Sequence, residues 1–237
     1  MPAIHLFGGE KGGVGKSFVC RTAIAYHQMH EIDFAPFDTD RSNPDVMRTY
    51  EKAANCQAAI LSEDSDYADA ANIIFRTAIN RRVLVNLSAQ SYIPLKRWLD
   101  DNDLFGFAEE EGIKFYLWFV SDCGYESLNL LSESLKYFGD RVQHVMVANY
   151  GMTKNWEPFT ANKSLQELIA VYGVKVMRFP KFVGNEEREK ISSKFIPFES
   201  VLKRSDDFDK FSRRRVRIFL KNASSAFEAV GYFDAAK

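Results

Sequence analysis

The sequence predicts an α/β fold in which a mostly parallel central sheet is covered by helices on both faces. Short apolar runs recur along the chain, and segments of helical pattern and length separate them. Several runs are apolar at consecutive positions and do not alternate with polar residues, which is typical of strands buried on both faces. Strands that alternate with helices form right-handed βαβ units, and the strands of such units run parallel.

Six strands and at least seven helices are predicted. The strands cover residues 3–7, 32–37, 82–87, 114–120, 143–149 and 174–179. The helices cover residues 16–30, 44–60, 66–80, 91–103, 125–138, 160–172 and about 211–229. The charge-rich stretch 184–210 is expected to hold surface loops and a further helix. No repeat or long linker divides the 237 residues, so we expect one domain over 1–237 that ends in a basic helical segment at about 203–230.

The composition excludes several classes of protein. The formal net charge is −1, so any affinity for nucleic acid or membranes has to come from a local patch. The three cysteines, Cys20, Cys56 and Cys123, lie far apart, which indicates reduced thiols and no disulfide framework. No signal peptide and no apolar run of membrane-spanning length is recognisable, so we expect a cytoplasmic protein.

A phosphate-binding loop follows the first predicted strand. The stretch GGEKGGVGKS, residues 8–17, ends where the first helix begins, which is the context of a P-loop. Glycines let main-chain N–H groups approach phosphates, and the N-terminus of the helix adds a partial positive charge. Lys16 is expected to reach the β- and γ-phosphates, and Ser17 to ligate Mg²⁺ through its hydroxyl. The predicted nucleotide-binding residues of the loop are Gly12, Gly13, Val14, Gly15, Lys16, Ser17 and Phe18.

The loop contains a second lysine, Lys11, and has Glu10 where the common P-loop pattern has glycine. In this respect KGGVGKS resembles the deviant phosphate loop of the ParA/MinD superfamily of P-loop ATPases. The opening residues also look like those of plasmid mobilisation and conjugation proteins of the TraL/MobD type. The resemblance implies that Lys11 reaches across a dimer interface to the ATP held by a second copy. ATP and Mg²⁺ are then the expected cofactors, and Lys11, Lys16 and Asp40 the expected catalytic residues.

Polar residues follow the second and third long strands. In DTD, residues 38–40, the resemblance assigns Asp38 to the magnesium shell and Asp40 to the attacking water. Asn43 or Asp38 also suits a cap that ends the strand and starts the helix at 44, with Pro44 in its first turn, and this role is compatible with the other. At Asn86 the family has a Walker B aspartate that holds Mg²⁺ through water. Either Asn86 is natural and hydrolysis is weak, or it is an introduced substitution that traps the ATP state.

The base of the nucleotide is expected at the ends of two later strands. A side-chain amide pairs a donor with an acceptor and therefore suits the edge of adenine, and Asn149 ends its strand. The resemblance places a proline-containing loop over the base, which matches Pro180. Lys181 and Phe182 are expected beside it. Asn149 alone is equally compatible with a plain strand-end turn.

The chain ends in a basic helix with an apolar stripe. The cations considered for phosphate contacts are Arg213, Arg214, Arg215, Arg217 and Lys221. Packing of the stripe against the sheet leaves these cations as a solvated face. The resemblance also supports contacts of the cations with nonspecific DNA, or less favourably a membrane-surface helix.

The predicted function is an ATPase that dimerises with ATP, separates on slow hydrolysis, and positions, partitions or helps to transfer plasmid DNA. A homodimer and an adaptor or activating protein are the expected partners. Two alternatives stay open. Asn86 favours a nucleotide-binding scaffold or sensor that does not hydrolyse ATP. A nitrogenase-reductase-like assembly ATPase is supported only by Cys123.

Overall fold

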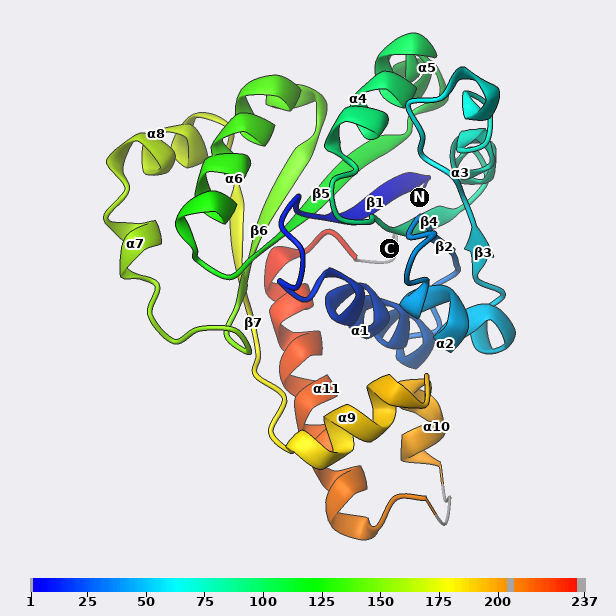
Figure 1. Ribbon diagram of the computed structural model, residues 1–237, viewed down its shortest axis with the longest axis vertical. Helices are drawn as coiled ribbons and strands as arrows, with labels where there is room; N and C mark the ends of the chain where they lie inside the picture. The colour runs from blue at the N-terminus through cyan, green and yellow to red at the C-terminus, as the bar shows by residue number, and fades with distance from the viewer. Residues whose placement is uncertain (1, 204–206, 234–237) are drawn as a thin grey trace.

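A parallel sheet forms the centre of the molecule, as predicted (Figure 1). The computed structural model describes residues 2–203 and 207–233. Within them the sheet has seven strands in the order β3-β2-β4-β1-β5-β6-β7, and every neighbouring pair is parallel. The strands are β1 (Ala3–Gly8), β2 (Phe34–Asp38), β3 (Gln57–Ala58), β4 (Arg82–Asn86), β5 (Lys114–Ser121), β6 (Gln143–Asn149) and β7 (Lys175–Phe179).

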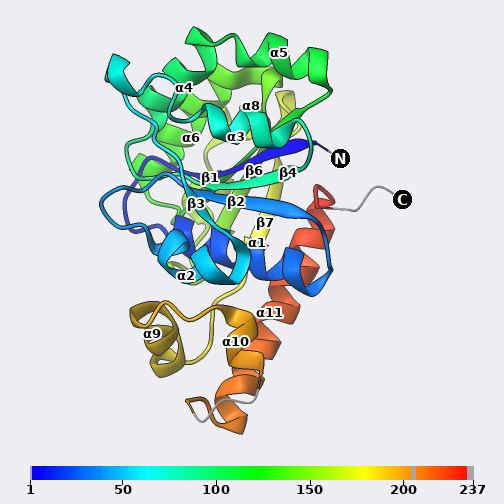
Figure 2. The same ribbon diagram turned by 90° about the vertical axis from the view of Figure 1, so that its right-hand side faces the viewer.

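Helices cover both faces of this sheet and bury two separate apolar cores (Figure 2). One face carries α3 (Asn72–Ala78), α4 (Tyr92–Asp101), α5 (Leu104–Glu111), α6 (Tyr125–Phe138), α7 (Glu157–Thr160) and α8 (Lys163–Val171). The other face carries α1 (Lys16–Met29), α2 (Asp45–Ala54), α9 (Asn185–Ser193), α10 (Phe198–Leu202) and α11 (Lys210–Val230). The predicted fold class is thereby confirmed.

Three predicted helices have different bounds in the structure. The helix predicted at 44–60 ends at Ala54, because Asn55 adopts a left-handed conformation with φ 52° and the chain then forms the edge strand β3. The helix predicted at 66–80 is shortened to α3, behind a 3₁₀ turn at Ser65–Tyr67. Beyond α4, Asp103 has φ 45° and breaks the helix, so that α5 follows as a separate element.

A small helical lobe extends from the sheet below α1 and α2 (Figure 1). It consists of α9, α10 and the first half of α11, and Arg21 of α1 is buried against it. The Arg21 guanidinium donates to the carbonyls of Ile191 and Ile196 and pairs with Asp45 at 3.3 Å. Of the basic segment predicted at 203–230, residues 204–206 lie outside the described residues. Among the described helices, none has both the length and the apolar character needed to cross a membrane.

Candidate functional site

The predicted site residues gather at the carboxyl edge of the sheet. The register of the strands places Asn86 beside Phe7 of β1 on one side and beside Asp38 of β2 on the other. The phosphate loop leaves β1 at the same edge, and Asn149 ends β6 there. In parallel α/β sheets, ligands bind at this edge, where the strand order changes direction.

The phosphate loop leads directly into α1. Gly15 is the N-cap of this helix with φ 98°, and Gly13 has φ 76°, conformations that side chains rarely adopt. The space that a Cβ atom would occupy at Gly12 and Gly13 is open, so the loop presents bare backbone on that side. This arrangement offers N–H groups and the positive end of a helix to an anion.

The two lysines of the loop point to different partners. Lys16 is buried, with 7% of its surface exposed, and its Nζ donates to the carbonyl of Lys11 at 2.8 Å. Burial lowers the pKa of Lys16, although the carboxylates of Glu10 and Asp40 oppose the shift. Lys11 is more exposed and pairs with Asp122 at 2.7 Å.

Asp122 is a site residue that sequence reasoning missed. It follows β5 in a tight turn, where its second oxygen accepts the N–H of Gly124 at 3.0 Å and the next residue, Cys123, has φ 65°. Partial burial raises the pKa of Asp122, but the hydrogen bond and charge of Lys11 outweigh it and hold the pKa below its usual value. The carboxylate therefore stays ionised beside Lys11 at neutral pH.

Asp38 and Asn86 form a buried pair in the middle of this edge. The amide of Asn86 donates to Asp38 Oδ1 at 2.8 Å, and both side chains are almost fully buried. The other oxygen of Asp38 accepts the N–H of Met47, in the first turn of α2, so Asp38 also caps that helix. Burial raises the pKa of Asp38, while the Asn86 hydrogen bond opposes the shift. The Oδ1 atom of Asn86 is buried and has no hydrogen-bond partner among the described residues.

Asp40 organises its own loop. Its Oδ1 accepts hydrogen bonds from the N–H groups of Ser42 and Asn43 and from the Ser42 hydroxyl, at 2.7 to 3.1 Å. Of the two cap candidates, Asp38 accepts an N–H of the first turn of α2, whereas the bonds of Asp40 lie in the loop before that helix. Ser17 is half-buried in the first turn of α1.

Asn149 fastens the phosphate loop to the sheet. Its amide nitrogen donates to the carbonyl of Val14 at 2.8 Å, and its oxygen accepts the N–H of Gly151 at 2.9 Å. A Cβ atom at Gly15 would come within 2.6 Å of the Asn149 nitrogen, so the close approach requires glycine at position 15. The contact with Gly151 is the strand-end turn that was one predicted alternative, whereas the contact with Val14 was not predicted; together they occupy one donor and one acceptor of the amide.

A cavity of about 610 Å³ opens beside the loop. Its volume is in the usual range of small-molecule sites, about 300–1,000 Å³. Pro180 and Phe182, which are predicted to contact the base, line this cavity, whereas Lys181 is exposed and is not part of its wall. Sequence reasoning missed the contribution of α9, which lies in the charge-rich stretch expected to be surface. The remaining lining residues are Gly13, Gly15, Phe18, Asn149, Gly151, Met152, Phe179, Asn185, Arg188, Glu189 and Ser192.

The basic helix α11 packs on the sheet through its apolar stripe, as one alternative predicted. Four of its five cations point outward: Arg213 is half-buried, and Arg214, Arg217 and Lys221 are exposed. Arg215 instead pairs at 2.7 Å with Glu187 of α9, which is 7% exposed. Its charge is therefore engaged within the protein.

The three cysteines are buried. All three are free, and Cys123 lies in the turn beside Asp122. Within residues 2–203 and 207–233, no group of three or more His, Cys, Asp or Glu side chains is arranged to hold a metal ion.

Comparison with known proteins identifies relatives of the chain. No protein-family model matches it. Protein MobD of Acidithiobacillus ferrooxidans is 25% identical over 202 residues, which cover 85% of this chain and 87% of MobD. MinD of Aquifex aeolicus, alone and in a complex with MinC, has a similar structure with a TM-score of 0.53 in both cases. These comparisons cover all of this chain and 100% and 99% of MinD, at 12% and 10% identity.

A nucleotide-binding protein of Archaeoglobus fulgidus, solved with ADP, gives a TM-score of 0.51 at 12% identity. The comparison covers 98% of this chain and 92% of that protein. The expected resemblance is therefore confirmed: this chain has the fold of the MinD-type ATPases of the ParA/MinD superfamily and shares sequence with MobD over most of its length.

Proposed function

We propose that the protein is an ATPase of the ParA/MinD type that forms a homodimer around ATP and separates when the nucleotide is slowly hydrolysed. The observation that carries this proposal is the contrast between the two loop lysines. Lys16 is turned into its own phosphate loop, whereas Lys11 projects to the surface and pairs with Asp122. An ammonium group near the surface beside a phosphate site would be available to the nucleotide of a second copy once it leaves Asp122.

The residues present fit ATP and Mg²⁺. The open backbone at Gly12 and Gly13 accommodates phosphates, and the unpartnered oxygen of Asn86 suits a water molecule in a metal's hydration shell. Ser17 and Asp38 would hold the metal with Asn86, and Asp40 would orient the attacking water. When bound, the metal supplies charge neutralisation for the phosphates. Asn86 lacks the negative charge of an aspartate, which accounts for slow turnover.

The cavity beside the loop would take the base. Pro180 and Phe182 supply apolar walls, and Asn149 has one amide hydrogen beyond the one it gives to Val14. The solved complex of the A. fulgidus protein with ADP supports a nucleotide at this fold.

The output of the switch would be the positioning, partition or transfer of plasmid DNA in the cytoplasm. Similarity to MobD over most of the chain supports this role. The complex of MinD with MinC supports a partner protein that docks on the ATPase. The exposed cations Arg214, Arg217 and Lys221, with the half-buried Arg213, would contact DNA phosphates without reading sequence.

The proposal is tested by measuring mass in solution with ADP, ATP and a non-hydrolysable ATP analogue. A dimer is expected with the analogue and ATP, and a monomer with ADP. Lys11→Ala should abolish the dimer while nucleotide affinity persists, and Lys136→Ala, at an exposed position on α6, is the matched control. Normal dimerisation of Lys11→Ala would overturn the proposal.

A second function, a nucleotide sensor that does not turn over, is favoured by Asn86 alone. Phosphate release from ATP separates the two: the sensor dimerises with ATP and releases no phosphate above a Lys16→Ala control.

A further inference from the structure

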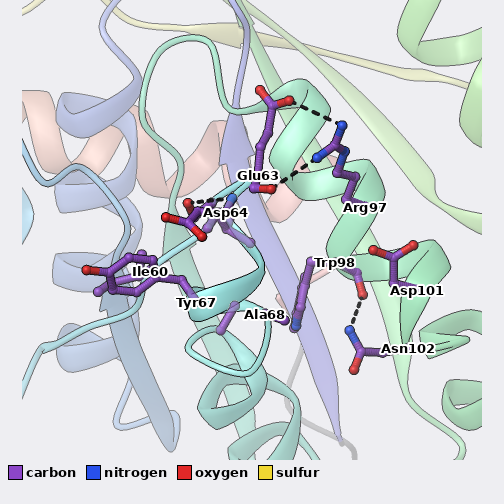
Figure 3. Close-up of a pocket in the computed structure, with 12 residues that line it drawn as sticks. Ile60, Glu63, Asp64, Tyr67, Ala68, Arg97, Trp98, Asp101 and Asn102 are labelled. Carbon is purple, nitrogen blue, oxygen red and sulfur yellow. Dashed lines mark hydrogen bonds and ion pairs between the residues drawn. The ribbon is translucent and has the colours of Figure 1, made fainter.

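A second cavity lies away from the phosphate loop, between α4 and the segment 60–71 (Figure 3). The buried part of its apolar lining, here called the floor, includes Ala71 and the indole ring of Trp98, and Ala68 lines the cavity from an exposed position. The only polar atom of that ring, Nε1, donates to Asn72 at 2.9 Å and so needs no partner in the cavity. The volume of about 230 Å³ is below the usual range of cofactor sites, about 300–1,000 Å³. A single protruding side chain suits such a space better than a nucleotide.

The rim of the cavity is acidic. Glu63, Asp64 and Asp101 lie around the Trp98 ring (Figure 3). Arg97 is the one basic residue in the described lining, and it already pairs with Glu63 at 3.5 Å. Asp64 and Asp101 have no ion pair within the described chain. Asp66 and Asp69 lie on the same segment, so the carboxylates in and beside the cavity outnumber the cations.

An apolar floor with an acidic rim defines the chemistry of the occupant. We propose that this cavity docks a basic peptide segment of a partner protein, which inserts one aliphatic or aromatic side chain and places lysines or arginines on the rim. The apolar anchor supplies affinity by filling a desolvated pocket. The cations on the rim supply specificity and a faster association rate.

The cavity is joined to the phosphate site by two contacts. The N–H of Ala59 donates to the carbonyl of Asp38 at 3.0 Å, at the start of the segment that forms the cavity. The guanidinium of Arg41, one residue after Asp40, stacks over the ring of Tyr67 at 5.4 Å, and Tyr67 lines the cavity. A docked peptide therefore contacts a segment that is held to the Asp38–Asp40 loop. This link to ATP use rests on the proposed function, whereas the docking itself does not.

The docking is tested with random twelve-residue peptides displayed on phage and selected on the whole protein. We expect the enriched peptides to carry net positive charge around one large apolar residue. Synthetic copies should bind more weakly as salt rises and should shift tryptophan emission, and Trp98→Phe should abolish the shift. No enrichment, or enriched peptides without basic residues, would overturn the proposal.

Two variants separate the rim from the floor. Asp64→Lys with Asp101→Lys reverses charge at exposed positions and should weaken binding at least tenfold. Ala68→Trp fills the cavity without changing charge and should weaken it similarly. Glu157→Lys with Glu167→Lys, at exposed positions on α7 and α8, is the matched control and should bind normally. Equal binding by all variants would place the peptides elsewhere, including on a second copy's contact surface, and would overturn the proposal.

The same reagents keep the two proposals apart. If the protein binds the peptides but stays monomeric with ATP, the proposed dimer switch is wrong and the proposed docking site is supported. ATP-dependent dimerisation without any peptide binding would sink only the docking site.

Discussion

Replacing Asn86 by aspartate tests whether the buried amide stands in for the charge of a Walker B residue. In the structure the Asn86 nitrogen lies 2.8 Å from Asp38 Oδ1, and neither side chain exceeds 3% exposure. Asn86→Asp turns this donor into a second acceptor, so two carboxylates face each other in a dry site. At an effective dielectric constant of about 20, full ionisation of both would cost about 6 kcal/mol. The pair is therefore expected to retain one proton.

The retained proton makes the stability of the variant depend on pH. An aspartate in the unfolded chain has a pKa of about 3.9, whereas the folded pair keeps its shared proton to a much higher pH. Above pH 4, roughly, the folded state then binds more protons than the unfolded state, so stability falls as pH rises. We expect a loss of about 2 kcal/mol at pH 5.5 and about 4 kcal/mol at pH 8, which corresponds to roughly 10 °C in melting temperature at the higher pH.

The measurement is thermal unfolding of Asn86→Asp at both pH values, with and without Mg²⁺ and ATP. Bound metal would neutralise the carboxylates, so Mg²⁺ with ATP should restore much of the loss, and the hydrolysis rate should exceed that of the original protein. Asn86→Ala is the control, because it removes the hydrogen bond without adding charge; the pKa of Asp38 then rises further, so stability should fall with rising pH in the same direction but less than in Asn86→Asp. A melting temperature of Asn86→Asp that follows the original protein at both pH values would refute the reasoning.

Three further predictions follow from contacts at and around this edge. Asp122→Asn keeps the acceptor for its turn but releases Lys11 for the second copy, so the ATP dimer should tighten by up to roughly fivefold per protomer in sedimentation experiments; a weaker dimer would contradict this. Asn149→Ala removes the hydrogen bond to the phosphate loop at Val14 and the one that closes the turn at Gly151, so it should lower stability by about 2 kcal/mol and weaken ATP binding, measured by urea unfolding and calorimetry; unchanged ATP affinity would show that the loop keeps its conformation without Asn149. Burial lowers the pKa of His27 to about 3 and of His144 to about 4, so both stay neutral when folded. Unfolded imidazoles gain protons below about pH 6.5, whereas these two stay neutral in the folded protein. Each histidine should therefore lower the free energy of unfolding by about 1.4 kcal/mol for every unit that the pH falls between roughly pH 6 and pH 4. Replacing either histidine by glutamine should reduce this slope, measured by urea unfolding at several pH values.

The long strands could be predicted because their signal is local. Each is a run of consecutive apolar residues, and burial on both faces needs no knowledge of the partner strand. Strand β3 has only two residues, both exposed, and therefore carries no such signal. The helix breaks at Asn55 and Asp103 depend on positive φ at residues that also tolerate helical conformations, so a helical pattern continues through them in the sequence.

The part of the candidate site that could be predicted best is the phosphate loop, because its residues are consecutive in the sequence. The spacing of glycines and lysines in residues 8–17 indicates phosphate binding without knowledge of the fold. The contact of Lys11 with Asp122 joins residues 111 positions apart and depends on β1 and β5 being neighbours in the sheet. A signal existed in principle: an aspartate directly after a strand, in a turn before a helix, is placed at the ligand edge of a parallel sheet once the strand order is known.

The positions of the two lysines also indicate how the switch would be kept off. The ammonium of Lys16 donates to the carbonyl of Lys11, and the ammonium of Lys11 pairs with Asp122. Lys11 therefore connects Lys16 to Asp122 through two contacts. Under the proposed function, phosphates that attract Lys16 would take it from the Lys11 carbonyl and would loosen the backbone that positions the Lys11 ammonium. Nucleotide binding within one copy and release of its outer lysine toward the other would then be steps of the same rearrangement, because a ligand shifts an equilibrium only through groups that it contacts differently in the two states.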